Sequence, residues 1–257
     1  MFGLTHILYM LVSAIVSALL LVVFAIKLKD RYAKEAVLKF FAVATVAIHF
    51  SSLWVDFFAS GSATVSEPML LPIHPCNVCM WLLLICAFSK KRSGVPYRLL
   101  SEFTFWAGTV CGIIGIVLNE NFGANPTLAD YGVLKGMLSH STMLFGAIYL
   151  LAGGFVKLRV FNVISSVSGL LLFVLDGALI NALYTVFFDQ NCNSMYLQEP
   201  PFPNAPWFGT LLMGIIGVSL VFLVTAIYEN LMLPKEDRWY VLLKKKYLER
   251  KENKKVC

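Results

Sequence analysis

Charged residues are scarce in this chain of 257 residues. Asp, Glu, Lys and Arg together make up 14% of the sequence, about half of their share in an ordinary soluble domain. A soluble enzyme needs a charged exterior, and a disordered chain needs high polarity, so both classes are excluded. With hydrophobic residues at 58%, the composition indicates a membrane protein that crosses the bilayer several times.

The apolar residues are concentrated in seven long runs. Each run reaches the roughly 20 residues that one helix needs to cross the hydrocarbon core of a bilayer. The runs are continuous and do not alternate with polar residues, so they predict helices rather than strands of a barrel. We therefore predict an all-α polytopic membrane protein, a bundle of seven transmembrane helices over Leu4–Ile26, Ala36–Phe58, Met69–Phe88, Leu99–Leu118, Tyr131–Phe155, Val160–Phe187 and Trp207–Tyr228.

Lys and Arg are missing from every second connection between these runs. All but one of the 21 basic residues lie in or beside the first, third and fifth connections or in the C-terminal tail, and the exception is Lys135. By the positive-inside rule, this distribution places the N-terminus outside and the C-terminus in the cytoplasm. We predict a seven-helix transmembrane domain over residues 1–233 and a basic cytoplasmic tail over residues 234–257. The net charge of +6 thus marks topology, and no nucleic-acid partner is expected.

Two segments outside the predicted spans invite a functional interpretation. The tail starts with Trp239 and Tyr240 and continues with many Lys residues, so it is predicted either to lie against anionic lipid or to be solvated. The last outer connection, residues 188–206, has 19 residues, a length typical of a lid or an entrance as well as of a simple connector. The protein is expected in the cell membrane, or in the endoplasmic reticulum or another endomembrane if its source is eukaryotic.

Ionisable residues inside the predicted spans are costly and usually face the bundle interior or a watery cavity. Helix lengths place polar groups of four different spans at similar depths in the outer half of the membrane. We predict that they share a cavity open to the outer side, and the alternative is a set of separate hydrogen bonds between helices. The residues concerned are His49, Asp56, His74, Cys76, Cys79, His140 and Asp176.

Helical periodicity adds detail to these spans. His49, Ser52 and Asp56 share one face of the second span. Pro72 and Pro75 predict a bend in the third span next to Cys76. Four other residues are expected to be structural. Gly108 and Gly112 would allow close helix packing, and Glu102 and Glu229 would lie near the membrane interface.

A thiol and an imidazole within hydrogen-bond reach can act as a nucleophile and its base. In a membrane the accessible esters are lipids, and attack by Cys76 would give an acyl thioester. A zinc site is an alternative, since His and Cys are suitable ligands, but no ligand pair recurs at a standard spacing. A transporter is another alternative, because permeases use His and Asp inside the membrane. P-loop, HExxH and GxSxG patterns are absent.

Three motifs give the sequence a family resemblance. LPIHPC at residues 71–76, LSHSTMLFGAIYL at 138–150 and NAPWFG at 204–209 resemble elements of bacterial YwaF-type integral membrane proteins and of the related transmembrane protein 164 family. The resemblance implies a lipid acyltransferase that moves a fatty acyl chain between phospholipids, with its nucleophile at Cys76 and its essential histidine at His140. It also implies a fold similar to that of the androgen-induced membrane hydrolases. The sequence departs from the bacterial pattern at Pro75, where Leu is usual.

We therefore hypothesise a membrane enzyme that acts on phospholipid acyl esters by transfer or hydrolysis. Cys76 is the expected nucleophile and His140 the general base, without a metal or a cofactor. The predicted supporting residues, which would orient groups or bind substrate, are His49, Asp56, His74, Cys79 and Asp176. The rival hypotheses are a transporter or small-ligand-binding protein that uses the same cavity without covalent chemistry, and a structural or assembly factor.

Overall fold

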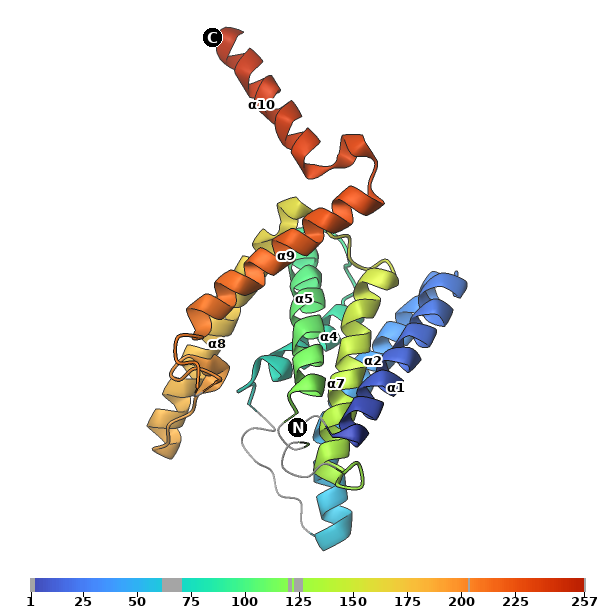
Figure 1. Cartoon of the computed structure of the whole chain (residues 1–257), viewed down its shortest axis with the longest axis vertical. Coiled ribbons are helices and arrows are strands. Elements are labelled where there is room, and N and C mark those ends of the chain that lie inside the picture. Colours follow the sequence, from blue (N-terminus) through green and yellow to red (C-terminus); the bar gives the residue numbers. More distant parts are fainter. Residues whose placement is uncertain (1–2, 62–70, 120–121, 123–126, 203, 257) are drawn as a thin grey trace.

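The structure is a computed structural model, and it describes residues 3–61, 71–119, 122, 127–202 and 204–256. The described part is helical and contains no strand (Figure 1), so the predicted all-α class is confirmed. The long helices are α1 (Leu4–Leu21, extended by η1, Val22–Lys27), α2 (Arg31–Ser60), α4 (Pro75–Phe88), α5 (Val95–Val117), α7 (Tyr131–Ala152), α8 (Ile164–Phe188), α9 (Thr210–Met232) and α10 (Trp239–Val256). Short helices are η2 (Val160–Asn162), η3 (Ser194–Tyr196) and η4 (Lys235–Asp237).

Five helices of the described part are long and apolar enough to cross a membrane, so the chain is a membrane protein. They are Leu4–Lys27, Arg31–Phe58, Val95–Val117, Val160–Phe188 and Thr210–Met232. The remaining two predicted spans are α4 and α7. α4 has only 14 residues, and its predicted start at Met69 lies outside the described residues. α7 has 22 residues but is not among these five helices.

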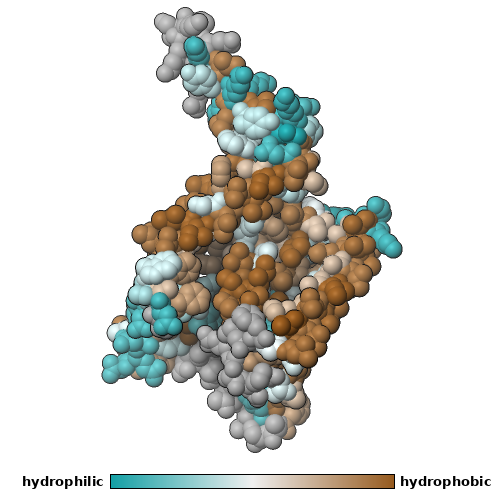
Figure 2. Space-filling model, viewed as in Figure 1, coloured by the Kyte–Doolittle hydropathy of each residue, from teal (hydrophilic) through white to brown (hydrophobic). Residues whose placement is uncertain are grey.

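The polarity of α7 follows from its central position. It packs against α1, α2, α4 and α5 (Figure 1), so its side chains face other helices on most sides. Polar groups there find partners on neighbouring helices: Thr142 accepts a hydrogen bond from Thr45 of α2 at 3.1 Å, and Ser141 contacts Tyr9 of α1 at 2.9 Å. By contrast, the outer faces of α1, α8 and α9 are rich in exposed Leu, Ile and Val. Figure 2 shows an apolar surface over the body of the molecule.

Aspartates fix where two of these helices begin. Asp30 precedes α2 and accepts a hydrogen bond from the backbone N–H of Ala33 at 2.7 Å. Asp130 precedes α7 and accepts one from the N–H of Val133 at 3.0 Å. Both carboxylates satisfy a backbone donor that the first helical turn leaves without a partner.

Small residues bring α5 and α7 close together. A side chain carbon added at Gly108 would lie 2.9 Å from the Cβ of Ala147, and one at Gly112 would lie 2.7 Å from the Cβ of Leu144. Neither position has room for a larger residue. At Gly112 the atoms that a Cβ would meet include the backbone of α7. The Gly108–Gly112 pair therefore serves close helix packing, as predicted.

The connections that carry the basic residues meet at one end of the bundle. The guanidinium groups of Arg31 and Arg92 lie 4.3 and 5.2 Å from the ring centre of Phe155, which brings the α1–α2, α4–α5 and α7–α8 connections together. At the same end, Arg159 donates to the backbone carbonyl of Asp237 at 3.0 Å. α10 leaves the bundle from this end (Figure 1).

The two glutamates expected near the interface are in fact buried. Glu229 is 0% exposed, and its carboxylate accepts hydrogen bonds from the backbone N–H groups of Val160 and Trp239 at 2.7 and 2.9 Å. It thus ties the starts of η2 and α10 to α9. Glu102 is 3% exposed and accepts hydrogen bonds from Asn162 and Ser165 at 2.7 and 3.3 Å. The sequence did not indicate these partners.

The contact between α5 and α7 gives a stability test. Gly112→Ala forces a Cβ against the backbone of Leu144, and such overpacking typically costs about 1–3 kcal/mol. We expect a lower midpoint of thermal unfolding in detergent, followed by near-UV circular dichroism. Gly217→Ala in α9 is the control, because nothing lies within 4 Å of a Cβ there. Equal midpoints for the two variants would contradict this packing.

Candidate functional site

Three helices surround a small cavity of about 40 Å³. Its walls combine polar groups with the soft side chains of Cys and Met. The lining residues are Thr45 and His49 of α2, Cys76, Asn77 and Met80 of α4, and Ser139, His140 and Met143 of α7. The structure therefore brings three of the sequence-predicted site residues, His49, Cys76 and His140, around one cavity.

Cys76 lies in the first turn of α4. This helix begins at Pro75, and the preceding residue His74 has extended backbone angles. The predicted bend at Pro72 and Pro75 is wrong, because the two prolines precede or open the helix instead of interrupting it. Pro suits the first helical position, where a backbone donor has no partner to lose. The Cys76 thiol donates a hydrogen bond to the Oδ1 atom of Asn77 at 3.4 Å.

His140 projects from α7 toward α5 and the cavity. A Cβ at Gly115 of α5 would overlap the imidazole ring, and Nδ1 of His140 is among the atoms that it would meet. That nitrogen is buried and has no hydrogen-bond partner among the described residues. Nε2 is not among the ring atoms nearest to Gly115. The absence of a side chain at Gly115 is what gives the ring this position.

The second span presents its polar face to α7, as its periodicity predicted. Thr45 and His49 line the cavity, and Ser52 accepts a long hydrogen bond from Lys135 of α7 at 3.5 Å. Asp56 lies two turns beyond His49 on the same helix and is not among the cavity-lining residues.

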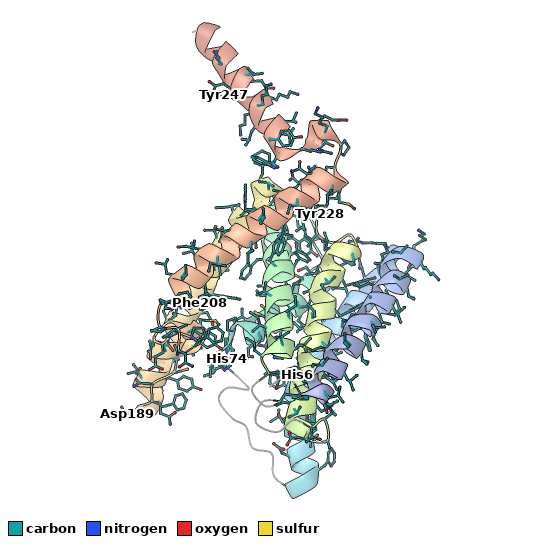
Figure 3. All side chains as sticks on the ribbon, viewed as in Figure 1. His6, His74, Asp189, Phe208, Tyr228 and Tyr247 are labelled. Atoms are coloured by element: carbon teal, nitrogen blue, oxygen red, sulfur yellow. The ribbon has the colours of Figure 1, made fainter. Side chains whose placement is uncertain are left out.

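Three further predicted residues lie away from the cavity. His74, labelled in Figure 3, is exposed. Its ring lies 6.2 Å from that of Tyr196 in the α8–α9 connection. Cys79 is buried against α5, with its sulfur 3.8 Å from that of Cys111. Asp176 of α8 does not line the cavity.

His6, the remaining histidine, has a structural role. Its Nε2 atom lies 2.7 Å from the carbonyl oxygen of Ile116, and its ring stacks on Phe122 at 4.5 Å between centroids. It therefore ties α1 to the end of α5. Figure 3 labels His6 on α1 and His74 at the start of α4, so the two rings belong to separate places in the fold.

The α8–α9 connection holds the segment that leads into α4. Ile73 accepts hydrogen bonds on its carbonyl from the N–H of Met195 at 3.1 Å and from the hydroxyl of Ser194 at 2.9 Å. Asn181 of α8 accepts one from the N–H of Ser194 at 2.8 Å. Met195 and Tyr196 have left-handed backbone angles, which non-glycine residues adopt only where the surroundings enforce them. This connection is therefore a clasp on the residues immediately before Cys76.

Cys192 is buried in the same connection, next to Ile73, Ile180 and Tyr184. Burial raises the pKa of its thiol, so the group stays protonated at neutral pH. A protonated thiol is a poor nucleophile. Cys192 thus contributes to packing.

Sequence analysis missed five residues of the cavity, namely Thr45, Asn77, Met80, Ser139 and Met143. Thr45 lies one turn before His49, and Asn77 and Ser139 are direct neighbours of Cys76 and His140. Helical spacing from the predicted residues would have found Thr45, Met80 and Met143. The contact between the Asn77 amide and the thiol has no periodic signal.

The cavity offers a thiol, two imidazoles, an amide and two hydroxyls in a setting of Met side chains. This donor set suits proton transfer and nucleophilic attack on a carbonyl. A metal site is not evident, because no group of three or more His, Cys, Asp or Glu residues in the described ranges is arranged to hold an ion.

Comparison with known protein families identifies the family of the chain. The model of the TMEM164 family matches residues 1–228, which is most of the chain and includes every residue of the cavity. No curated protein and no solved structure matches the chain.

The clasp gives a test of the local structure around Cys76. Asn181→Ala leaves the buried N–H of Ser194 without its acceptor, which typically costs about 1–3 kcal/mol. We expect faster chymotrypsin cleavage after Tyr196 and Leu197 in the purified protein, measured by mass spectrometry. Thr185→Val is the control, because the Thr185 hydroxyl bonds only to a carbonyl of its own helix. Unchanged cleavage in Asn181→Ala would exclude the clasp.

Proposed function

Because the chain belongs to the TMEM164 family, we propose that it transfers fatty acyl chains between phospholipids through a thioester on Cys76, with His140 as general base. The observation that supports this proposal is that Cys76 and His140, from two different helices and 64 positions apart, line the same cavity. The family resemblance assigns its nucleophile and its histidine to the same two positions.

The reaction has two halves. In the first, Nε2 of His140 takes the thiol proton, the thiolate attacks an ester carbonyl of a phospholipid, and the ester C–O bond breaks. The departing lysolipid oxygen receives the proton from His140, and the acyl group remains on Cys76. In the second half, His140 takes the proton of another lipid's hydroxyl, whose oxygen attacks the thioester. The C–S bond breaks, and the thiolate recovers its proton.

The walls of the cavity favour transfer over hydrolysis. Met80 and Met143 contribute apolar surface, and both are buried. A site that excludes water protects an acyl intermediate from hydrolysis. His49, which lines the cavity from α2, is suited to bind or polarise the substrate ester.

Covalent capture tests the reaction. The purified protein is incubated with a phospholipid labelled in its acyl chain, and we expect a labelled, hydroxylamine-sensitive adduct on Cys76. Cys76→Ser abolishes this adduct, and His140→Ala lowers its rate of formation by about 100-fold or more, since a general base typically contributes 10²–10⁴-fold. Peptide mass spectrometry locates the acyl group.

Cys86→Ser is the matched control for this experiment. Cys86 is buried in the same helix, and its thiol contacts Thr104 at 3.4 Å, away from the cavity. We expect wild-type adduct formation in this variant. No adduct in the wild-type protein, together with solute flux in liposomes that survives Cys76→Ser, would establish the transporter instead.

We also propose a topology of seven spans in the cell membrane, with α4 and α7 completing the set and the N-terminus outside. Its support is the charge: the connections rich in Lys and Arg meet at one end of the bundle, and α10 continues from that end. Figure 2 shows polar side chains on α10 beyond the apolar body. On the cytoplasmic side this helix faces a leaflet whose anionic lipids attract its Lys residues.

Trypsin tests this topology, because the proposed outer connections contain no Lys or Arg. We expect the enzyme to remove α10 from inverted membrane vesicles and to leave the protein intact in right-side-out vesicles. In liposomes, phosphatidylglycerol should slow cleavage of α10 relative to phosphatidylcholine, and added salt should reverse this protection. Loss of α10 from right-side-out vesicles would overturn the orientation, and equal rates in both lipids would exclude the lipid contact.

A further inference from the structure

Asn77 is a buried amide beside the proposed nucleophile. It follows Cys76 in the first turn of α4, is 9% exposed and lines the cavity. Burying an amide in apolar surroundings is unfavourable unless its groups are hydrogen-bonded. An amide at this position, with the reactive sulfur as its neighbour, therefore calls for a chemical explanation.

The two ends of this amide have different contacts. Oδ1 accepts the hydrogen bond from the Cys76 thiol at 3.4 Å, and Nδ2 donates to the carbonyl of Leu71 at 3.5 Å. The bond to Leu71 is at the long limit for N–H···O. A half turn of the carboxamide exchanges its acceptor and its donor.

The backbone N–H of Cys76 is a second donor next to the same sulfur. It donates to no backbone carbonyl of the described residues, whereas the backbone N–H of Asn77 donates to the carbonyl of His74 at 2.9 Å. Pro75 has no backbone donor. The start of α4 therefore directs one backbone N–H, together with the positive end of the helix dipole, toward the space around Cys76.

Resting on the acyl transfer proposed above, we propose that the Asn77 carboxamide and the backbone N–H of Cys76 form the oxyanion-binding group of this site. In the resting protein the carboxamide accepts the thiol hydrogen bond and fixes the direction of the sulfur. After the proton has passed to His140, the carboxamide turns and presents Nδ2 to the substrate.

The electrons and protons of this step balance without further reactants. The thiolate sulfur forms a bond to the ester carbon, and the carbonyl electron pair moves onto the oxygen. Nδ2 of Asn77 and the N–H of Cys76 donate hydrogen bonds to that oxygen. The pair returns when the lysolipid oxygen departs, and Asn77 neither gains nor loses a proton.

Asn77→Asp is the decisive variant, because it keeps an oxygen acceptor of the same shape and replaces the donor with a repelling charge. We expect the rate of adduct formation with labelled phospholipid to fall by about 100- to 1000-fold, the usual effect of losing one oxyanion donor. The lipid concentration for half-maximal rate should stay within about threefold of wild type, since the donor acts on the transition state.

Asn77→Ser distinguishes a catalytic effect of Asn77→Asp from a loss of folding. A hydroxyl both accepts and donates, so this variant should react faster than Asn77→Asp and more slowly than wild type. Gln198→Glu in the α8–α9 connection is the matched control, because it makes the same change of amide to carboxylate at a side chain that is exposed. We expect its adduct formation to stay within threefold of wild type.

The outcomes separate the two proposals. A wild-type protein that forms no adduct overturns the acyl transfer itself. A wild-type adduct that forms equally fast in Asn77→Asp overturns the role of Asn77 alone. Equal losses in Asn77→Asp and Asn77→Ser, with lowered thermal midpoints in both, show a structural residue and also overturn it. A slow Asn77→Asp with a wild-type midpoint supports the role.

Discussion

The close approach of α5 to α7 is the constraint on which the rest of the bundle depends. Gly108 and Gly112 bring the two backbones together, and Gly115 continues the same stripe where the His140 ring needs room. One row of glycines therefore provides both the packing seam and the position of the imidazole. Since α7 also contacts α1, α2 and α4, a change in this seam would move every wall of the cavity at once.

Buried carboxylates organise the opposite end of the molecule. Glu229 and Glu102 accept hydrogen bonds from the segments that lead into α8 and α10, while Arg31 and Arg92 stack on Phe155. The end of the bundle that carries the basic connections is thus fixed by specific polar contacts. The end near Cys76 is fixed by the clasp of the α8–α9 connection on Ile73. Each end has its own polar anchor, and the apolar helices join them.

Much of the fold could be predicted because apolar runs and charge distribution depend on local sequence. The polar face of the second span and the glycine pair were also correctly predicted, since helical periodicity sets both. The bend at Pro75 was wrong because a proline inside an apolar run has the same pattern whether it opens a helix or interrupts it. Gly115 was missed because its importance depends on His140 in another helix. Asn77 was missed because its contact with the Cys76 thiol is a single side-chain contact without a periodic signal.

α4 begins at Pro75 and has 14 residues, so it is about 21 Å long, well short of the roughly 30 Å hydrocarbon core. In the proposed seven-span topology, lipid beside α4 would meet a hydrophobic mismatch, which bilayers accommodate by local thinning. Headgroups next to α4 would then lie closer to the midplane, together with their ester carbonyls. The shortness of this one helix would thereby lower the ester bonds of a neighbouring lipid to the depth at which Cys76 lies.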